Sequence, residues 1–159
     1  MTDDREAAFR SGLKYLGPRA RSVAELKENL LKKKFSSDTV DETVERMKEE
    51  NLLDDEAFAE EFVRNRERLT PKSKRALKFE LFRKGIEETV IDKAVEPVNE
   101  YEAALKAVSK KSALWEHLDK QEFKKKVFNF LKTRGFNFEV SMTTYMHLLR
   151  KTEKKEDVE

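Results

Sequence analysis

Lysine and arginine clusters are the groups in this 159-residue chain whose types and spacing best suit a chemical task. Three short clusters, Lys32–Lys34, Arg83–Lys84 and Lys132–Arg134, recur at similar places, and a longer basic stretch spans residues 64–84. Guanidinium and ammonium groups bind phosphates and carboxylates. The clusters therefore predict contact with DNA phosphates or with an acidic protein groove, and the sequence alone does not separate these partners.

A plainer explanation for each cluster is a solvated helix face. Lysine and arginine form helices well and favour the last turn, next to the negative end of the helix dipole. The recurrence of the clusters at equivalent positions favours binding instead, because stacked units would align them. Acidic residues collect elsewhere, at 38–50, 54–61 and 87–96, so a chain of net charge +2 still carries strong local fields.

Groups that support catalysis are scarce. His117 and His147 have no acidic or thiol partners at metal-ligand spacing, and cysteine is absent, which excludes disulfides and zinc–thiolate sites. Helix capping explains the acidic pair Asp54-Asp55 better than catalysis does. The four glycines are scattered, so they form no phosphate-binding loop. The sequence predicts a protein that is not an enzyme and needs no cofactor or metal.

The elements that position the basic clusters form an internal repeat. Apolar residues follow one spacing over Leu26–Val44 and again over Leu77–Val95, and Val127–Phe136 begins a third copy. Each copy is typical of a helix, a short turn and a second helix, with the basic cluster just before the turn. A repeat of roughly 45 residues predicts small helical units that stack and present a long surface.

Signals for helix starts and ends predict nine helices and no strands along the chain. These helices are expected to form three tandem three-helix units, each similar to a helix-turn-helix. Ser22 with Glu25 has the pattern of a capping box, Thr70-Pro71 indicates a helix start, and glycine at 85 and 135 indicates helix ends. The last helix is expected over about 138–151. The expected units are 1–53, 54–98 and 99–159, the last with a charged C-terminal tail.

Aromatic residues interleave with the basic ones, a pattern that also occurs where nucleic-acid bases stack. Because many of them fall at helical spacing, we expect most to pack in cores. This group comprises Phe58, Phe62, Phe79, Phe82, Phe123, Phe128 and Phe130.

The segment NLLDDEAFAEEFVRNR, residues 51–66, resembles the signature of the RecX family, regulators of the bacterial recombinase RecA. The resemblance spans roughly residues 7–147. Further motifs resemble the first, second and third units of that family in the expected order; they are Arg19–Leu26 with Leu30–Phe35, Pro71–Ser73 with Leu77–Ile86, and Phe130–Phe136. The chain departs from the family pattern at Lys34 and Ser73, where glycine is common, and at Ser141, where Val140 is expected to replace an aliphatic residue.

The resemblance implies three tandem three-helix units in an elongated, curved molecule without a cofactor. It implies binding in the groove of the RecA–DNA filament and inhibition of ATP hydrolysis, coprotease action and strand exchange. The alternative is a protein that acts through nonspecific nucleic-acid contact alone. Acidic helices over 38–50 and 87–96 disfavour sequence-specific duplex recognition. A cytoplasmic location is expected, since no apolar run is long enough to span a membrane. The protein is also expected to be a monomer.

Charge and position, rather than the motif matches, select the candidate contact residues for the filament or DNA. They are Arg19, Arg21, Lys32 and Lys33 in the first unit, Arg64, Arg66, Lys72, Lys74, Arg75 and Lys84 in the second, and Lys124, Lys125, Lys132 and Arg134 in the third.

Overall fold

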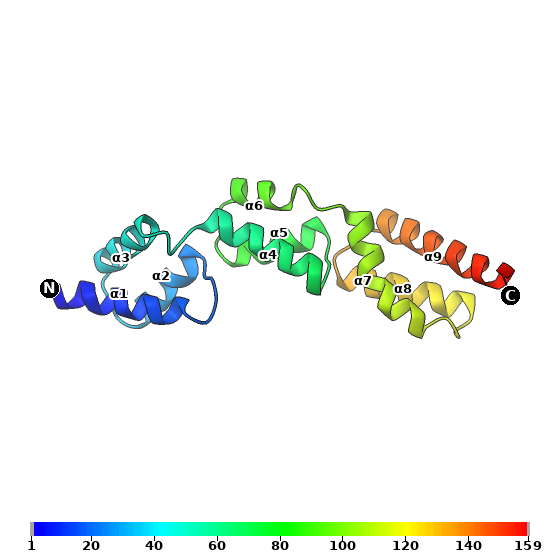
Figure 1. The fold of residues 1–159 in the computed structure, drawn as a ribbon, viewed down its shortest axis with the longest axis horizontal. Coiled ribbons are helices and arrows are strands. Elements are labelled where there is room, and N and C mark those ends of the chain that lie inside the picture. Colours follow the sequence, from blue (N-terminus) through cyan, green and yellow to red (C-terminus); the bar gives the residue numbers. More distant parts are fainter. Residues whose placement is uncertain (1, 159) are drawn as a thin grey trace. The chain divides into compact units, whose positions relative to one another are not determined.

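The computed structural model describes residues 2–158, with side chains for residues 4–154. Within these residues all secondary-structure elements are α-helices (Figure 1). The expected all-α chain of tandem three-helix units is confirmed. In chain order the helices are α1 (Thr2–Leu16), α2 (Val23–Lys32), α3 (Ser37–Glu49), α4 (Asp55–Leu69), α5 (Lys74–Arg83), α6 (Glu88–Val95), α7 (Glu100–Leu114), α8 (Lys120–Thr133) and α9 (Phe138–Val158).

The chain divides into two compact bodies. The first body comprises Met1–Phe62 with Glu80–Ala94, and the second comprises Val63–Phe79 with Val95–Glu159. Each body thus contains one outer three-helix unit together with parts of the middle unit's helices. Within the part of the chain that the structure describes, no helix has both the length and the apolar character of a membrane-spanning segment.

The apolar positions that define the repeat form the cores. All of these positions are buried except Phe35, which is half-buried. They are Leu26, Leu30, Phe35, Val40 and Val44 in the first copy, Leu77, Leu81, Ile86, Ile91 and Val95 in the second, and Val127, Leu131 and Phe136 in the third. In the first body, α1, α2 and α3 enclose Phe9, Leu26, Leu30, Val40, Val44, Met47 and Leu53. In the second body, α7, α8 and α9 enclose a larger core that includes Val108, Phe123, Val127, Leu131, Phe136, Val140 and Tyr145.

The second helix of every unit ends in the same turn. Lys34, Gly85 and Gly135 follow α2, α5 and α8 with positive φ of 73°, 76° and 88°. One residue later, the backbone N–H donates back to a carbonyl of the last helical turn: Phe35 to Leu30 at 3.3 Å, Ile86 to Leu81 at 3.2 Å and Phe136 to Leu131 at 3.0 Å. These are Schellman motifs, which reverse the chain after a helix and satisfy its last carbonyls.

Two expected helix boundaries are wrong. Helix α5 begins at Lys74 rather than at Pro71, and the Ser73 hydroxyl caps it by accepting the Ala76 N–H at 3.0 Å. The Ser73 carbonyl accepts the first N–H of this helix, from Leu77, at 3.0 Å, and the Ser73 N–H donates to the Arg134 carbonyl at 3.1 Å. Helix α9 continues past residue 151 to Val158, since its charged end is rich in helix-forming lysine and glutamate.

Candidate functional site

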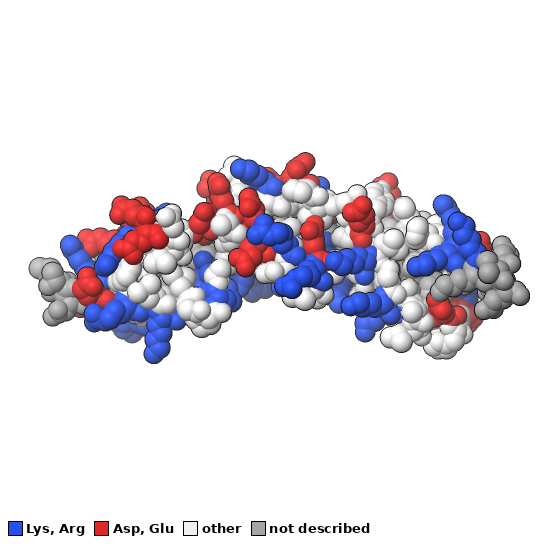
Figure 2. All heavy atoms as spheres, viewed as in Figure 1, with Lys and Arg blue, Asp and Glu red and all other residues white. Residues whose placement is uncertain are grey.

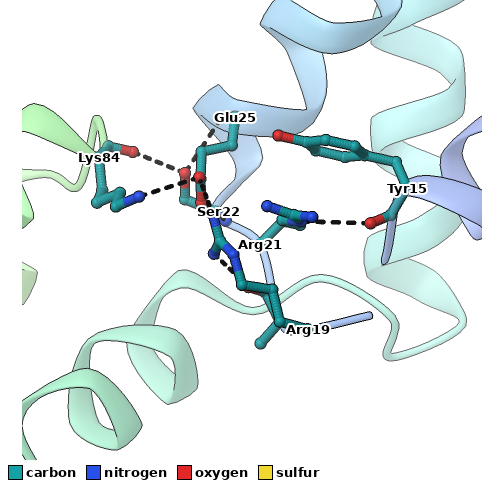
Figure 3. Close-up of polar contacts among 7 residues, drawn as sticks. Tyr15, Arg19, Arg21, Ser22, Glu25 and Lys84 are labelled. Atoms are coloured by element: carbon teal, nitrogen blue, oxygen red, sulfur yellow. Dashed lines mark hydrogen bonds and ion pairs between the residues drawn. The ribbon is translucent and has the colours of Figure 1, made fainter. Parts of the chain in front are cut away.

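A buried joint connects α2 and α5 within the first body (Figure 3). The fully buried Ser22 hydroxyl donates to the Lys84 carbonyl at 2.6 Å. The Glu25 carboxylate accepts the Ser22 N–H at 3.0 Å, a guanidinium N–H of Arg19 at 2.7 Å and the Lys84 ammonium at 3.3 Å. A Cβ on Gly85 would collide with Ala24, so glycine permits this close approach. We call Ser22, Ala24, Glu25, Lys84 and Gly85 the first joint.

Hydrogen-bond donors around the Glu25 carboxylate keep this group of the first joint ionised. Burial by itself raises the pKa of Glu25, but hydrogen bonds from Arg19, the Ser22 backbone and Lys84 outweigh burial and lower this pKa to about 2. Burial raises the pKa of Asp55, whose carboxylate accepts the Val23 N–H at 2.9 Å. Glu25 is therefore ionised at neutral pH, and it neutralises two of the cations predicted to bind a partner.

A second joint, formed by equivalent positions of the repeat, lies in the second body. Ser73 takes the place of Ser22, and its N–H donates to the Arg134 carbonyl at 3.1 Å. A Cβ on Gly135 would lie 2.5 Å from the Ser73 Oγ and 2.8 Å from the Ala76 Cβ. We call Ser73, Ala76, Arg134 and Gly135 the second joint. In both joints, the start of one unit's second helix packs against the end of the next unit's second helix.

Several of the predicted contact residues therefore have structural partners. Lys84 belongs to the first joint, and Arg19 donates to the Glu25 carboxylate of that joint. The Lys74 N–H donates to the Glu100 carboxylate at 2.8 Å, and its ammonium donates to the Glu96 carbonyl at 3.1 Å. The Arg134 guanidinium lies 5.0 Å from the centre of the Phe130 ring.

Arg21 and Lys33 are also engaged within the first body. The Arg21 guanidinium stacks 4.2 Å from the centre of the Tyr15 ring and donates to the Tyr15 carbonyl at 3.2 Å (Figure 3). Lys33 donates to the Ser11 hydroxyl at 2.9 Å. These contacts hold the turn between α1 and α2 and the end of α2, so both cations have a local role.

The other candidate cations are more accessible. Lys32 forms only a solvent-exposed pair with Glu28, 3.0 Å apart, which leaves its ammonium available to a partner. Arg66 and Lys72 are half-buried, and the Arg66 guanidinium lies 3.4 Å from the Thr70 hydroxyl. The exposed members are Arg64, Arg75, Lys124, Lys125 and Lys132.

Charge is segregated on the first body. Figure 2 shows Asp and Glu side chains gathered over α3, while Lys and Arg gather on the opposite side, over α1 and α2. The acidic cover of α3 follows from its sequence, which carries acids on its solvent face. An anionic partner would therefore approach the first body from the α1–α2 side.

A hollow in the second body brings two candidate cations beside aromatic rings. Arg75 and Lys132 line it together with Phe79, Phe128 and Phe138. The expectation that the aromatics pack in cores is correct for Phe58 and Phe123 and wrong for Phe79 and Phe82, whose exposed fractions are 60% and 71%. The periodicity contains the signal for these exceptions, because neither ring lies on the stripe of Leu77 and Leu81.

Possible catalytic or metal-binding groups are dispersed. His117 and His147 are both exposed. Asp54 caps α4 by accepting the Ala57 N–H at 3.1 Å, as the capping interpretation predicted. Within the described residues, His, Asp and Glu side chains form no group of three or more that would hold a metal ion.

These features define a tandem three-helix repeat protein whose units are linked through their second helices. Models of the first, second and third three-helix domains of RecX match residues 8–47, 54–95 and 99–142. The chain belongs to the RecX family, and the family resemblance inferred from the motifs is confirmed. The finer unit boundaries, 1–53, 54–98 and 99–159, remain predictions.

Curated relatives support the same assignment. "Regulatory protein RecX" of Chlorobium phaeobacteroides is 39% identical over 136 residues, which cover 86% of this chain and 89% of the relative. The protein of the same name from Chlorobium limicola is 35% identical over 138 residues, which cover 87% of each chain. The family is thus one of regulatory proteins that contain tandem helical units.

Solved structures share the fold. The crystal structure of RecX from Lactobacillus salivarius superimposes with a TM-score of 0.80 at 22% identity, covering 93% of this chain and 98% of that one. A second crystal structure, of a regulatory protein RecX, gives a TM-score of 0.75 at 24% identity, covering 90% and 72%. At these identities the likeness shows the fold alone.

The departures from the family pattern leave the fold intact. Lys34 adopts the positive φ that glycine usually supplies. Ser73 supplies a helix cap and a hydrogen bond in the second joint. Val140 is buried in the core of the third unit, as expected, and Ser141 beside it is also buried.

Proposed function

We propose that this protein is a noncatalytic regulator that binds the groove of the RecA–DNA filament and inhibits its ATPase, coprotease and strand-exchange activities. The observation that carries the proposal is that all three RecX domains match in order along this chain. We expect this protein to act as a monomer in the cytoplasm, during recombination and the SOS response to DNA damage.

The repeat offers a physical basis for filament binding. A filament presents the same surface many times, and linked units with individually weak contacts gain affinity when they bind together. The exposed cations on different units supply such contacts, which suit phosphates or carboxylates. A protein that prefers one filament state shifts the filament toward it without catalysing any reaction.

We assign the filament or DNA contacts to the accessible candidate cations. They are Lys32, Arg64, Arg75, Lys125 and Lys132. Lys124 is also exposed, although its ammonium lies 5.7 Å from the centres of the Phe128 and Tyr145 rings, and Arg66 and Lys72 are half-buried. Arg19, Arg21, Lys33, Lys74, Lys84 and Arg134 instead act first on the fold, because each already holds a neighbouring group of the chain.

The test measures ATP hydrolysis by the recombinase of the same organism on single-stranded DNA while this protein is titrated in. A parallel titration measures its binding to the same DNA without recombinase at the same salt. We expect inhibition at concentrations that leave bare DNA unoccupied. Absence of inhibition, or inhibition that follows DNA coverage, would favour the alternative of action through nucleic-acid contact alone.

A further inference from the structure

A stripe of apolar side chains along α9 stays partly exposed after this helix has packed into the core of the second body. We propose that, in chains not bound to a filament, this stripe pairs with the same stripe of a second copy, the two α9 helices running antiparallel. Pairing of this kind lies beyond the proposed function, in which a single chain acts on the filament. The α9 stripe consists of Phe138, Met142, Met146 and Leu149.

The spacing of the α9 stripe places its members on one side of the helix, next to the side that enters the core. Successive members are four, four and three residues apart, which keeps them on one helix face. Tyr145 and Leu148 fill the core positions. Phe138 is 70% exposed and Met146 is 42% exposed, and the other two members are half-buried against the core. The stripe is therefore an apolar face without a complete cover.

The α9 stripe lies on a long helix and is supported from behind. α9 contains 21 residues and is about 30 Å long. Phe138 packs on Phe128 with ring centres 5.7 Å apart, and Phe128 packs in turn on the buried Tyr145 at 6.0 Å. The methionines at the middle of the stripe have unbranched side chains that adapt to an opposing surface. A second helix can therefore pack along α9 without a change in the fold.

Two charges beside the α9 stripe favour an antiparallel second copy as its occupant. Glu139 and Arg150 are exposed and lie at opposite ends of the stripe. They are eleven residues apart, close to three full helical turns, so they share one face of α9. A two-fold axis between Met142 and Met146 would place Glu139 of each copy beside Arg150 of the other. The surface is then complementary to itself in both packing and charge, as a two-fold interface requires.

A parallel arrangement of the two helices is disfavoured by the same charges. Each charged group would then face its own counterpart, Glu139 against Glu139 and Arg150 against Arg150. Like charges that meet in an interface oppose association. The antiparallel pair is thus the arrangement that the sequence of α9 selects.

The α9 pair is expected to be weak. Its apolar contact comprises four side chains on each copy, whereas a standard interface has about 20 residues on each side. Pairing should therefore occur at high protein concentration and be lost on dilution. Dilution would leave the single chain that acts on the filament in the proposed function.

The test is sedimentation equilibrium of the full-length protein alone, from about 10 µM to about 1 mM. We expect the average mass to rise with concentration from 18.7 kDa toward twice that value. Met146→Glu should weaken association about tenfold or more, because a carboxylate would enter the apolar contact from both copies. His147→Glu is the matched control, since it adds the same charge at an exposed neighbour outside the stripe. Circular dichroism confirms that both variants are folded.

Exchanging the two charges tests the antiparallel arrangement. Glu139→Arg alone, or Arg150→Glu alone, would place like charges at both ends of the pair and should weaken association about fivefold. The double variant restores both ion pairs with reversed polarity, so its association should return to within about twofold of wild type. In a parallel pair neither single variant would have this effect.

An average mass that stays at that of one chain over the whole concentration range would overturn the proposal. So would a dimer that Met146→Glu leaves intact, or a double charge variant that associates no better than the single variants. If wild type stays monomeric while Met146→Glu abolishes filament inhibition, the stripe binds the filament and not a second copy. Association is measured without recombinase, so its failure is distinct from a failure of filament inhibition.

Discussion

At the scale of single residues, the turn after each second helix shows how one position serves two purposes. Gly85 and Gly135 need glycine both for their positive φ and because a neighbouring unit packs where a Cβ would lie. Lys34 has the same φ but is exposed, so its side chain fits. Only the backbone strain of a non-glycine residue remains there, and that strain is modest.

Exchanging residues at these turns should have opposite effects. Lys34→Gly should raise the free energy of unfolding by about 0.5–1 kcal/mol, since relief of left-handed strain exceeds the added entropy of the unfolded chain. Gly85→Ala should lower it by about 2 kcal/mol or more, because strain and a collision with Ala24 combine. Urea unfolding measures both, and destabilisation by Lys34→Gly would contradict the strain argument.

The first joint should make stability depend on acid. Glu25 has a pKa of about 2 in the folded protein against an ordinary value of 4.5. Its stabilising contribution is therefore present above pH 4.5 and is lost as the pH falls toward 2. Asp55 acts in the opposite direction, because its raised pKa favours the protonated form in the folded state.

Glu25→Gln should lower the free energy of unfolding by about 1–2 kcal/mol at pH 7, and the difference from wild type should shrink below pH 4.5. Glu28→Gln is the matched control on the same helix, because its pair with Lys32 is exposed and should matter by less than about 0.5 kcal/mol. Thermal unfolding across pH measures both. A difference between Glu25→Gln and wild type that is independent of pH would show that the carboxylate charge is not what stabilises the joint.

At the scale of helices, the repeat works because each second helix has a narrow apolar stripe and a defined end. Leu77 and Leu81 lie on that stripe in α5 and are buried, while Phe79 and Phe82 on the same helix are exposed. The stripe fixes which face enters the core, and the Schellman turn places the next helix against it. The remaining faces are left for charges and partner contacts.

Leu81→Ala should lower the free energy of unfolding by about 2–5 kcal/mol, the range for removing a buried leucine, because Leu81 is 0% exposed. Leu69→Ala provides the contrast: this leucine ends α4 with 67% of its surface exposed and should change stability by less than about 0.5 kcal/mol. Chemical denaturation compares the two. Similar small effects would mean that the site of Leu81 collapses around the shorter side chain.

At the scale of the whole molecule, the joints determine which cations are available to a partner. Arg19 and Lys84 neutralise Glu25, and Lys74 holds the Glu96 carbonyl. Mutating such residues disturbs the fold before it disturbs binding. A search for the filament contacts should therefore use exposed lysines that make no joint.

The lysines of α8 should contribute more to inhibition of the filament by this protein than the lysines of α7 do. Replacing Lys124, Lys125 and Lys132 with glutamine should weaken inhibition of the recombinase ATPase and leave the melting temperature unchanged. The matched control replaces the exposed lysines Lys106, Lys110 and Lys111 with glutamine. This triple substitution removes the same charge from α7 of the same unit. Equal loss in the two triple variants would indicate a general charge effect rather than a contact on α8.

The sequence by itself determined the helices, the repeat, the family and most of the core. These depend on local signals, such as the spacing of Leu26 and Leu30, the capping residues Ser22 and Glu25, and glycine after a helix. Each of them acts within a few residues, so the order of amino acids is sufficient to predict it.

Only the tertiary structure decided which cations are engaged and which are available. The Ser22 hydroxyl meets the Lys84 carbonyl, and the Ser73 N–H meets the Arg134 carbonyl, across large separations in sequence. No local pattern encodes such pairs, because they depend on how one unit packs against the next. The same packing gathered Arg75, Lys132 and the exposed rings of Phe79 and Phe138 around one hollow.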